Sequence, residues 1–108
     1  MSTLDFNKVN KKHLTIKFTD GKSIMVGTPT KRQLDSLLEN KELFTSGNDL
    51  GKEQLALLYD MCADLMSRNK GSVKITSDYL SEMFDLEDVT VFFAEYMKFV
   101  QGISNVKN

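Results

Sequence analysis

Hydrophobic residues in the last third of the chain follow the spacing of a single helical face. Between residues 86 and 101 the apolar positions recur every three or four residues, a spacing that predicts an amphipathic helix. The positions that form this stripe are Val89, Phe92, Phe93, Tyr96, Phe99, Val100 and Ile103. A small domain has a limited interior, so we expect part of this aromatic surface to contact another chain.

Near the N-terminus the pattern changes to alternation with a period of two, which predicts a β-hairpin. Leu14, Ile16 and Phe18 alternate with polar residues, and Asp20-Gly21 follows them. An Asp-Gly pair is a strong signal for a two-residue turn between antiparallel strands. The sequence therefore predicts a hairpin that is closed by these two residues.

The length of the predicted turn determines which residues face each other across the hairpin. A two-residue loop would place Phe18 opposite Ser23 and Ile16 opposite Met25. The return strand, residues 22–26, would then carry apolar side chains on both faces. An isolated hairpin is only marginally stable in water, so we expect helices or a neighbouring chain to cover it.

After the hairpin, helical spacing and capping signals predict a bundle of about four helices, and hence a mainly α fold with a small N-terminal β-hairpin. Thr30 and Gln33 form a capping box at the start of the first helix. A second helix is predicted over about residues 51–69. A cap at Thr76 or Ser77 begins a short third helix, and the aromatic helix is the fourth.

The segments between these helices carry turn and capping signals. Leu43-Phe44 is expected to dock as an apolar clasp after the first helix, and residues 45–48 have the composition of a loop. Gly71 can take the left-handed conformation that closes the long helix. Asp85 can end the short helix and cap the last one.

Length and composition indicate one ordinary globular domain. The chain has 108 residues, of which 41% are hydrophobic and 27% charged. We divide it into an N-terminal arm and hairpin (1–29), a helical part (30–103) and a tail (104–108). No apolar run approaches the length needed to cross a membrane, and we find no signal peptide. The single cysteine, Cys62, fits a reducing compartment, so a cytoplasmic location is expected.

Charge is unevenly distributed, although the net charge is only -1. Residues 1–32 contain seven basic and two acidic residues, whereas residues 76–101 contain six acidic residues and one basic residue. Such segments are most often solvated faces. The alternative interpretation is head-to-tail attraction between copies of the chain, which would favour a ring or an open helix.

The sequence offers few groups for catalysis or metal binding, which predicts a protein that is not an enzyme and needs no cofactor. His13 is the only histidine and is expected at the surface, while Cys62 lies on an apolar stripe and is expected to be buried. The glycines fit no phosphate-binding loop. Asp85, Glu87 and Asp88 lack the alternation of a calcium loop and are expected to cap a helix.

Nucleic acid is not an expected partner. Residues 75–93 join a short helix to a longer one, as a helix-turn-helix does. The longer helix carries several acids and only Lys98 as a base, and it would repel the phosphates of a major groove.

The order of these elements resembles the small tail assembly chaperones of long-tailed phages that infect Gram-positive bacteria, especially the lactococcal type. The resemblance covers nearly the whole chain and concerns layout. Its parts are the strand and Asp-Gly turn (14–26), the Thr-Pro-Thr start of a Leu-rich helix (28–30), Leu-Ala-Leu-Leu-Tyr-Asp (55–60), a short capped helix, an aromatic helix with an acidic start, and Asn-Val-Lys-Asn (105–108).

The resemblance implies a function in tail assembly. Such chaperones bind the tape measure protein, the long and largely helical ruler of the tail, and keep it soluble until tail-tube subunits displace them. They self-associate, in some cases as open spirals, act in the host cytoplasm and are absent from the mature virion. Our predicted partner-binding residues, for the tape measure protein or for self-contacts, are Met83, Phe92, Phe93, Tyr96, Met97 and Phe99.

Two other functions agree with the same sequence. A small adaptor or inhibitor that binds one folded host protein would use the acidic face of the last helix. A structural head-tail connector would be found in mature particles. Methionines adapt to irregular partner surfaces but also fill cores, and the aromatic residues of the last helix are common core residues as well.

Overall fold

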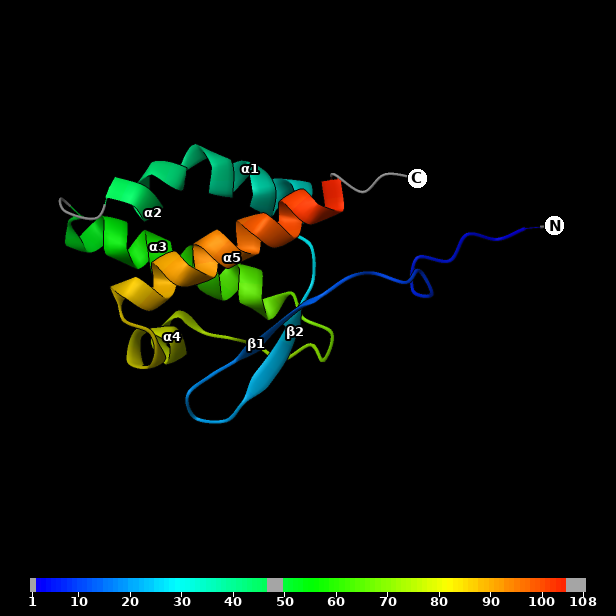
Figure 1. Cartoon of the computed structure of the whole chain (residues 1–108), viewed down its shortest axis with the longest axis horizontal. Coiled ribbons are helices and arrows are strands. Elements are labelled where there is room, and N and C mark those ends of the chain that lie inside the picture. The colour runs from blue at the N-terminus through cyan, green and yellow to red at the C-terminus, as the bar shows by residue number, and fades with distance from the viewer. Residues whose placement is uncertain (1, 47–49, 105–108) are drawn as a thin grey trace.

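Two short strands and five helices make up the described part of the chain, residues 2–46 and 50–104 of a computed structural model (Figure 1). Their bounds are β1 Leu14–Lys17, β2 Ser23–Val26, α1 Lys31–Glu39, α2 Lys41–Ser46, α3 Lys52–Ser67, α4 Ser77–Met83 and α5 Leu86–Ser104. The predicted mainly helical fold with a small N-terminal hairpin is confirmed.

The hairpin pairs in a different register from the predicted one. Ile16 faces Ile24 instead of Met25, because the loop has three residues and not two. Gly21 adopts a φ of 93°, and a glycine with positive φ is common at the end of such a loop. The shift by one residue turns Ile24 and Val26 together to the buried face. The predicted register was therefore wrong, whereas β2 does carry apolar side chains on both faces, since Met25 is 41% exposed on the outer face.

The outer edge of β2 is covered by the segment that follows α3. The Lys70 N–H donates to the Met25 carbonyl at 2.9 Å, and the Gly27 N–H donates to the Arg68 carbonyl at 2.9 Å. These bonds satisfy the backbone groups that an edge strand would otherwise expose. They also tie the hairpin to the end of α3.

The turn after α3 is organised by an asparagine and not by the predicted glycine. The Asn69 side-chain amide donates to the carbonyls of Met66 (2.8 Å) and Val73 (2.7 Å). The left-handed residue is Ser72, with a φ of 57°, whereas the φ of Gly71 is not positive. The prediction for Gly71 was wrong because these side-chain bonds shape the turn locally.

The segment between α1 and α3 begins with a second short helix, α2, where an apolar clasp was expected. Leu43 is half-buried and packs against the core. The predicted loop at 45–48 starts inside α2 and then runs into residues outside the described part of the chain. The same is true of residues 105–108 of the predicted tail.

Local capping signals act where the sequence placed them. Thr30 and Gln33 form both bonds of a capping box at the start of α1. Thr76 caps α4 by accepting from the Tyr79 N–H at 3.0 Å. Asp85 and Asp88 bond each other's backbone N–H groups at the start of α5 (3.0 and 2.9 Å).

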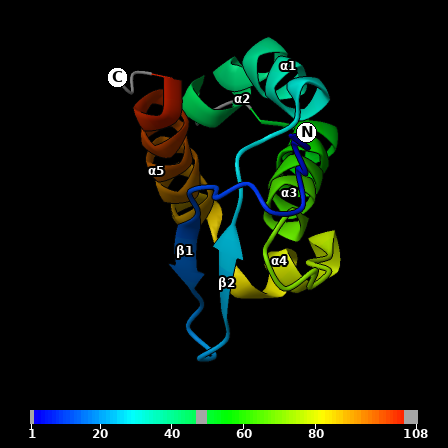
Figure 2. The ribbon, with the colours of Figure 1, turned by 90° about the vertical axis from the view of Figure 1, so that its right-hand side faces the viewer.

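The core lies between α3, α5 and the inner face of the hairpin. In Figure 2, α3 and α5 stand on opposite sides, α1 and α2 cross one end, and the hairpin and α4 close the other. The fully buried side chains are Val26, Leu37, Leu58, Cys62, Met66, Leu80, Val89 and Tyr96. The burial expected for Cys62 is confirmed.

Candidate functional site

An apolar groove with a volume of about 350 Å³ lies between β1, the end of α4 and α5. We call it the β1–α5 groove. Its apolar lining consists of Leu14, Ile16, Phe18, Met83, Phe84, Val91 and Phe92, and its polar lining of Thr15, Lys17, Thr19, Asp88 and Glu95. Grooves that combine apolar walls with a few polar groups at the rim are common binding sites.

Two periodicities meet in this groove. The strand directs Leu14, Ile16 and Phe18 to its inner face, since side chains alternate with a period of two. The helix contributes Asp88, Val91, Phe92 and Glu95, because positions three and four apart share one helical face. Val91 is 62% exposed, so the groove is open to a partner along α5.

The floor of the groove is held by an aromatic cluster at the hairpin tip. The Phe18 ring meets Tyr79 edge-on at 5.4 Å between centroids, and its centroid lies 5.8 Å from that of Phe84. The Tyr79 hydroxyl donates to Asp20 at 2.9 Å, and the Lys22 ammonium lies 4.9 Å from the Tyr79 ring centroid. These contacts fix β1 against α4, so the groove is preformed.

The charge of Asp20 is stabilised by the same contacts. Hydrogen bonds from the Lys22 N–H and then from the Tyr79 hydroxyl lower the pKa of Asp20 below its ordinary value. Burial and the bond to Asp20 raise the pKa of Tyr79. The pair is therefore an ionised carboxylate and a neutral phenol at neutral pH.

The end of the groove nearest α4 contains a flexible thioether. The Thr19 hydroxyl lies 3.1 Å from the Met83 sulfur and donates to it. Met83 remains partly exposed beside the groove. Because methionine has three rotatable bonds and a polarisable sulfur, it can adapt to different apolar partners.

Acidic residues line the α5 side of the rim. Asp88 and Glu95 lie about one helical turn before and after Val91. Lys17 is the only lysine in the groove lining. Glu95 is paired with Lys98 at 3.4 Å, but both side chains are more than half exposed, so solvent screens this pair. A basic partner segment matches this rim better than an acidic one.

The structure separates the six predicted partner-binding residues into three groups. Met83 and Phe92 line the groove, although Phe92 is only 6% exposed. Phe93, Met97 and Phe99 are partly buried and pack against the core. Tyr96 is fully buried and stacks on Phe92 at 5.4 Å. A contact role for Tyr96 would require a rearrangement of the core, whereas the partly exposed residues need none.

Burial also determines the state of the Tyr96 hydroxyl. Its oxygen lies 3.4 Å from the Gly27 carbonyl, at the long end of hydrogen-bonding distance. Burial raises the pKa of this phenol. Tyr96 therefore links α5 to the end of β2 as a neutral side chain.

Sequence reasoning missed the strand residues of the groove and Val91. Leu14 and Ile16 were recognised as apolar positions of a strand, but the predicted register did not show which face they would share. Val91 lies beside the main stripe of α5, where it reads as extra apolar surface. The alternation in β1 and the helical spacing in α5 each marked these residues as apolar. Only the packing of β1 beside α5 brings them together in one groove.

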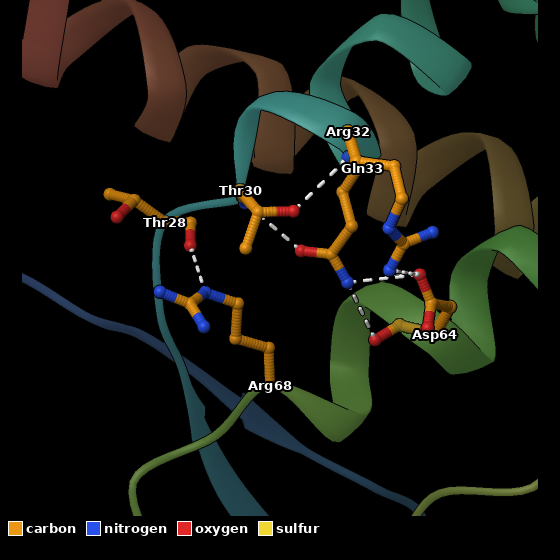
Figure 3. Close-up of polar contacts among 6 residues, drawn as sticks. All are labelled: Thr28, Thr30, Arg32, Gln33, Asp64 and Arg68. Atoms are coloured by element: carbon orange, nitrogen blue, oxygen red, sulfur yellow. Dashed lines mark hydrogen bonds and ion pairs between the residues drawn. The ribbon is translucent and has the colours of Figure 1, made fainter.

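A second cluster of polar side chains joins α1 to α3 (Figure 3). Gln33 is buried, and its amide nitrogen donates to the Asp64 side chain (2.9 Å) and to the Asp64 carbonyl (3.2 Å). Its amide oxygen accepts from the Thr30 N–H at 3.1 Å. The Arg32 guanidinium lies 3.9 Å from Asp64. Every polar atom of the buried amide is used, so this cluster positions α1.

The neighbouring Arg68 extends this connection to the strand. Its Nε donates to the Thr28 carbonyl at 2.7 Å, as Figure 3 shows. The bond anchors the segment between β2 and α1 on the end of α3. The guanidinium, amide and carboxylate groups of the cluster thus join α1, α3 and the segment after β2.

Reactive and metal-binding groups are sparse in the described residues. Burial raises the pKa of the Cys62 thiol to about 12, which leaves it protonated and inert at neutral pH. Within residues 2–46 and 50–104, no group of three or more His, Cys, Asp or Glu side chains is placed to hold a metal ion. No helix in the same part of the chain is both long and apolar enough to span a bilayer.

Comparison with known proteins adds no relative. No family model matches the chain, and neither a curated protein nor a solved structure matches it.

Proposed function

We propose that this protein is a tail assembly chaperone of a long-tailed phage, which binds the tape measure protein and keeps it soluble before the tail tube polymerises. The observation that carries the proposal is the open β1–α5 groove, which presents apolar side chains to a partner. The order of sequence elements described above supports the same assignment. The host cytoplasm, with absence from the mature virion, belongs to this proposal.

The groove suits a client that is apolar and repetitive. Amphipathic segments bind by inserting apolar side chains into a groove of this kind. The tape measure protein offers many such segments on one chain, so several chaperone copies can bind it together. Weak single contacts then add up to firm binding by avidity, while each contact remains easy for a tube subunit to displace.

The chemistry of the described residues favours a binding protein over an enzyme. The buried thiol of Cys62 is protonated, and the polar cluster around Gln33 is satisfied within the fold. The acidic rim at Asp88 and Glu95 disfavours nucleic acid as a partner of the groove. These features leave a protein client and self-association as the proposed partners.

Co-expression with an aggregation-prone fragment of the tape measure protein tests this proposal. The native chain is expected to increase the soluble fraction of the fragment. Val91→Lys is expected to abolish the increase because it places a charge in the groove. The new lysine can pair with Glu87 and Glu95 on the same helix, so α5 should remain stable.

Leu38→Lys is the matched control, because Leu38 is 49% exposed on α1 and lies outside the groove lining. This variant is expected to solubilise the fragment as well as the native chain does. A native chain without effect on the fragment would overturn the chaperone proposal and favour an adaptor for one folded host protein. Equal activity of Val91→Lys would show that the client does not use the groove.

A further inference from the structure

One edge of the hairpin is open beside the β1–α5 groove. In antiparallel pairing, alternate residues direct their backbone groups to opposite edges. Phe18 donates to Lys22 across the hairpin at 2.8 Å, so Thr15 and Lys17 direct theirs outward. Among the described residues no backbone hydrogen bond reaches these two from outside the hairpin. An open edge of this kind is a template for another strand.

The chain also has a segment suited to such an edge. Residues 2–12, which we call the arm, precede β1 and contain neither helix nor strand. Leu4 is 73% exposed and Phe6 is 68% exposed, and the two lie two positions apart. In an extended strand this spacing places both side chains on one face. Figure 1 shows the arm projecting away from the helices along the longest dimension, which is 56 Å.

The arm does not run toward the groove of its own chain. It leaves β1 and crosses to the β2 side of the sheet, as Figure 2 shows. There Phe6 and Val9 line a shallow hollow together with Met25, Asn69 and Lys70. The groove lies on the other side of β1, against α5. The path of the arm therefore leaves Leu4 and Phe6 exposed and away from the groove of their own chain.

Charge favours the same pairing. The arm contains Lys8, Lys11 and Lys12 against one aspartate. The groove rim on α5 contains Asp88 and Glu95. An apolar and basic segment thus matches an apolar groove with an acidic rim, within a single sequence.

We propose that the arm of one copy binds the β1–α5 groove of a second copy. The arm adds a strand to the open edge at Thr15 and Lys17, and its Leu4 and Phe6 enter the groove. Main-chain bonds supply affinity and the alternate side chains supply selectivity, as in other cases of strand addition. The arm gives up an exposed turn for this, in which the Asn7 N–H donates to the Asp5 carboxylate at 3.0 Å.

This arrangement specifies how self-association and client binding would be related. Arm and groove are different surfaces, so the contact is either exchanged within a dimer or passed from copy to copy in a ring or an open chain. The arm would cover the groove until a client segment replaces it, and in this respect the inference rests on the proposed function. The contact between copies itself can be measured without any client.

Light scattering across a concentration series tests the contact. The native chain is expected to gain mass with concentration. The double variant Leu4→Asp, Phe6→Asp and the groove variant Val91→Lys are each expected to associate at least about tenfold more weakly, because each removes apolar anchors of a small interface. The control Leu38→Lys should associate like the native chain. Thermal unfolding of each variant verifies its fold.

Mixing the arm variant with the groove variant tests directly whether the arm of one copy binds the groove of another. The arm variant keeps an intact groove and the groove variant keeps an intact arm, so the mixture is expected to form a one-to-one complex although each alone stays monomeric. A mixture that stays monomeric overturns the proposal, as does a native chain that is monomeric at all concentrations.

The client assay separates failure of this inference from failure of the proposed function. The arm variant lacks the contact between copies but keeps the groove. If it still solubilises the tape measure fragment while the native chain is monomeric, the contact between copies is refuted and the chaperone function stands. If the native chain associates through the arm but leaves the fragment insoluble, the chaperone function is refuted and the contact between copies stands.

Discussion

At the scale of single residues, burial determines whether a side chain of this protein keeps its charge and its reactivity. Cys62 is completely inaccessible on α3, and burial raises the pKa of its thiol to about 12 from an ordinary value of 9.0. The side chain thus acts as a small apolar group. Asp20 is the opposite case, because its surface carboxylate keeps its charge and accepts hydrogen bonds from Lys22 and Tyr79.

Cys62 is predicted to be unreactive in the folded protein. Modification by a thiol reagent at pH 8 should be at least about a hundredfold slower than in the urea-unfolded chain, because the thiol is protonated and inaccessible. The reaction is followed by absorbance with and without denaturant. Since the native pKa is the higher one, the stability from the neutral thiol is complete below pH 9 and is lost as pH rises toward 12. Fast labelling of the native chain at pH 8 would contradict this.

Asp20 is predicted to make the hairpin tip sensitive to acid. Its native pKa lies below the ordinary value of 3.8, so its contribution to stability is present above that pH and is lost as pH falls through the native pKa. Asp20→Asn should lower the melting temperature at pH 7, and the difference from the native protein should shrink near pH 2. A difference that is equal at both pH values would show that the carboxylate charge has no role.

At the scale of elements, backbone conformation separates two glycines that look alike in the sequence. Gly21 closes the hairpin loop with a φ of 93°, which side chains other than hydrogen rarely allow. Gly102 lies within α5 and has open space around it. Nothing lies within 4 Å of a Cβ at either position, so backbone conformation alone distinguishes them.

Substitution of these two glycines by alanine is predicted to have opposite effects. Gly21→Ala should lower the free energy of unfolding by about 1–2 kcal/mol, because alanine is strained at this φ. Gly102→Ala should raise it by up to about 1 kcal/mol, because alanine loses less backbone entropy in a helix. Urea unfolding of both variants measures the difference. Equal effects at the two positions would argue against the three-residue loop.

At the scale of the whole molecule, the site is a product of tertiary contacts. The groove joins residues from β1, α4 and α5, which are far apart in the chain. The proposed strand addition joins the arm to a different copy, so it depends on association between folded chains as well as on the fold of each chain. The client assay and the association assay described above address these two levels separately.

Local signals made much of the fold predictable from the sequence. The caps at Thr30, Thr76 and Asp85 depend on residues three positions away, and the apolar stripe of α5 depends on helical spacing alone. These features need no knowledge of distant segments. The helical part and the hairpin were therefore recognisable before their packing was known.

Tertiary structure decided the features that depend on distant partners. The hairpin register follows from a single additional loop residue and from burial of Ile24 and Val26 against helices. Packing buries Tyr96 and leaves Val91 open, although both lie on the same apolar helix. The sequence by itself determined the hairpin and the four predicted helices, since those preferences are local, but it did not show that α2 is a helix. Only the folded chain decided which apolar side chains are core and which line a groove, because burial depends on all segments at once.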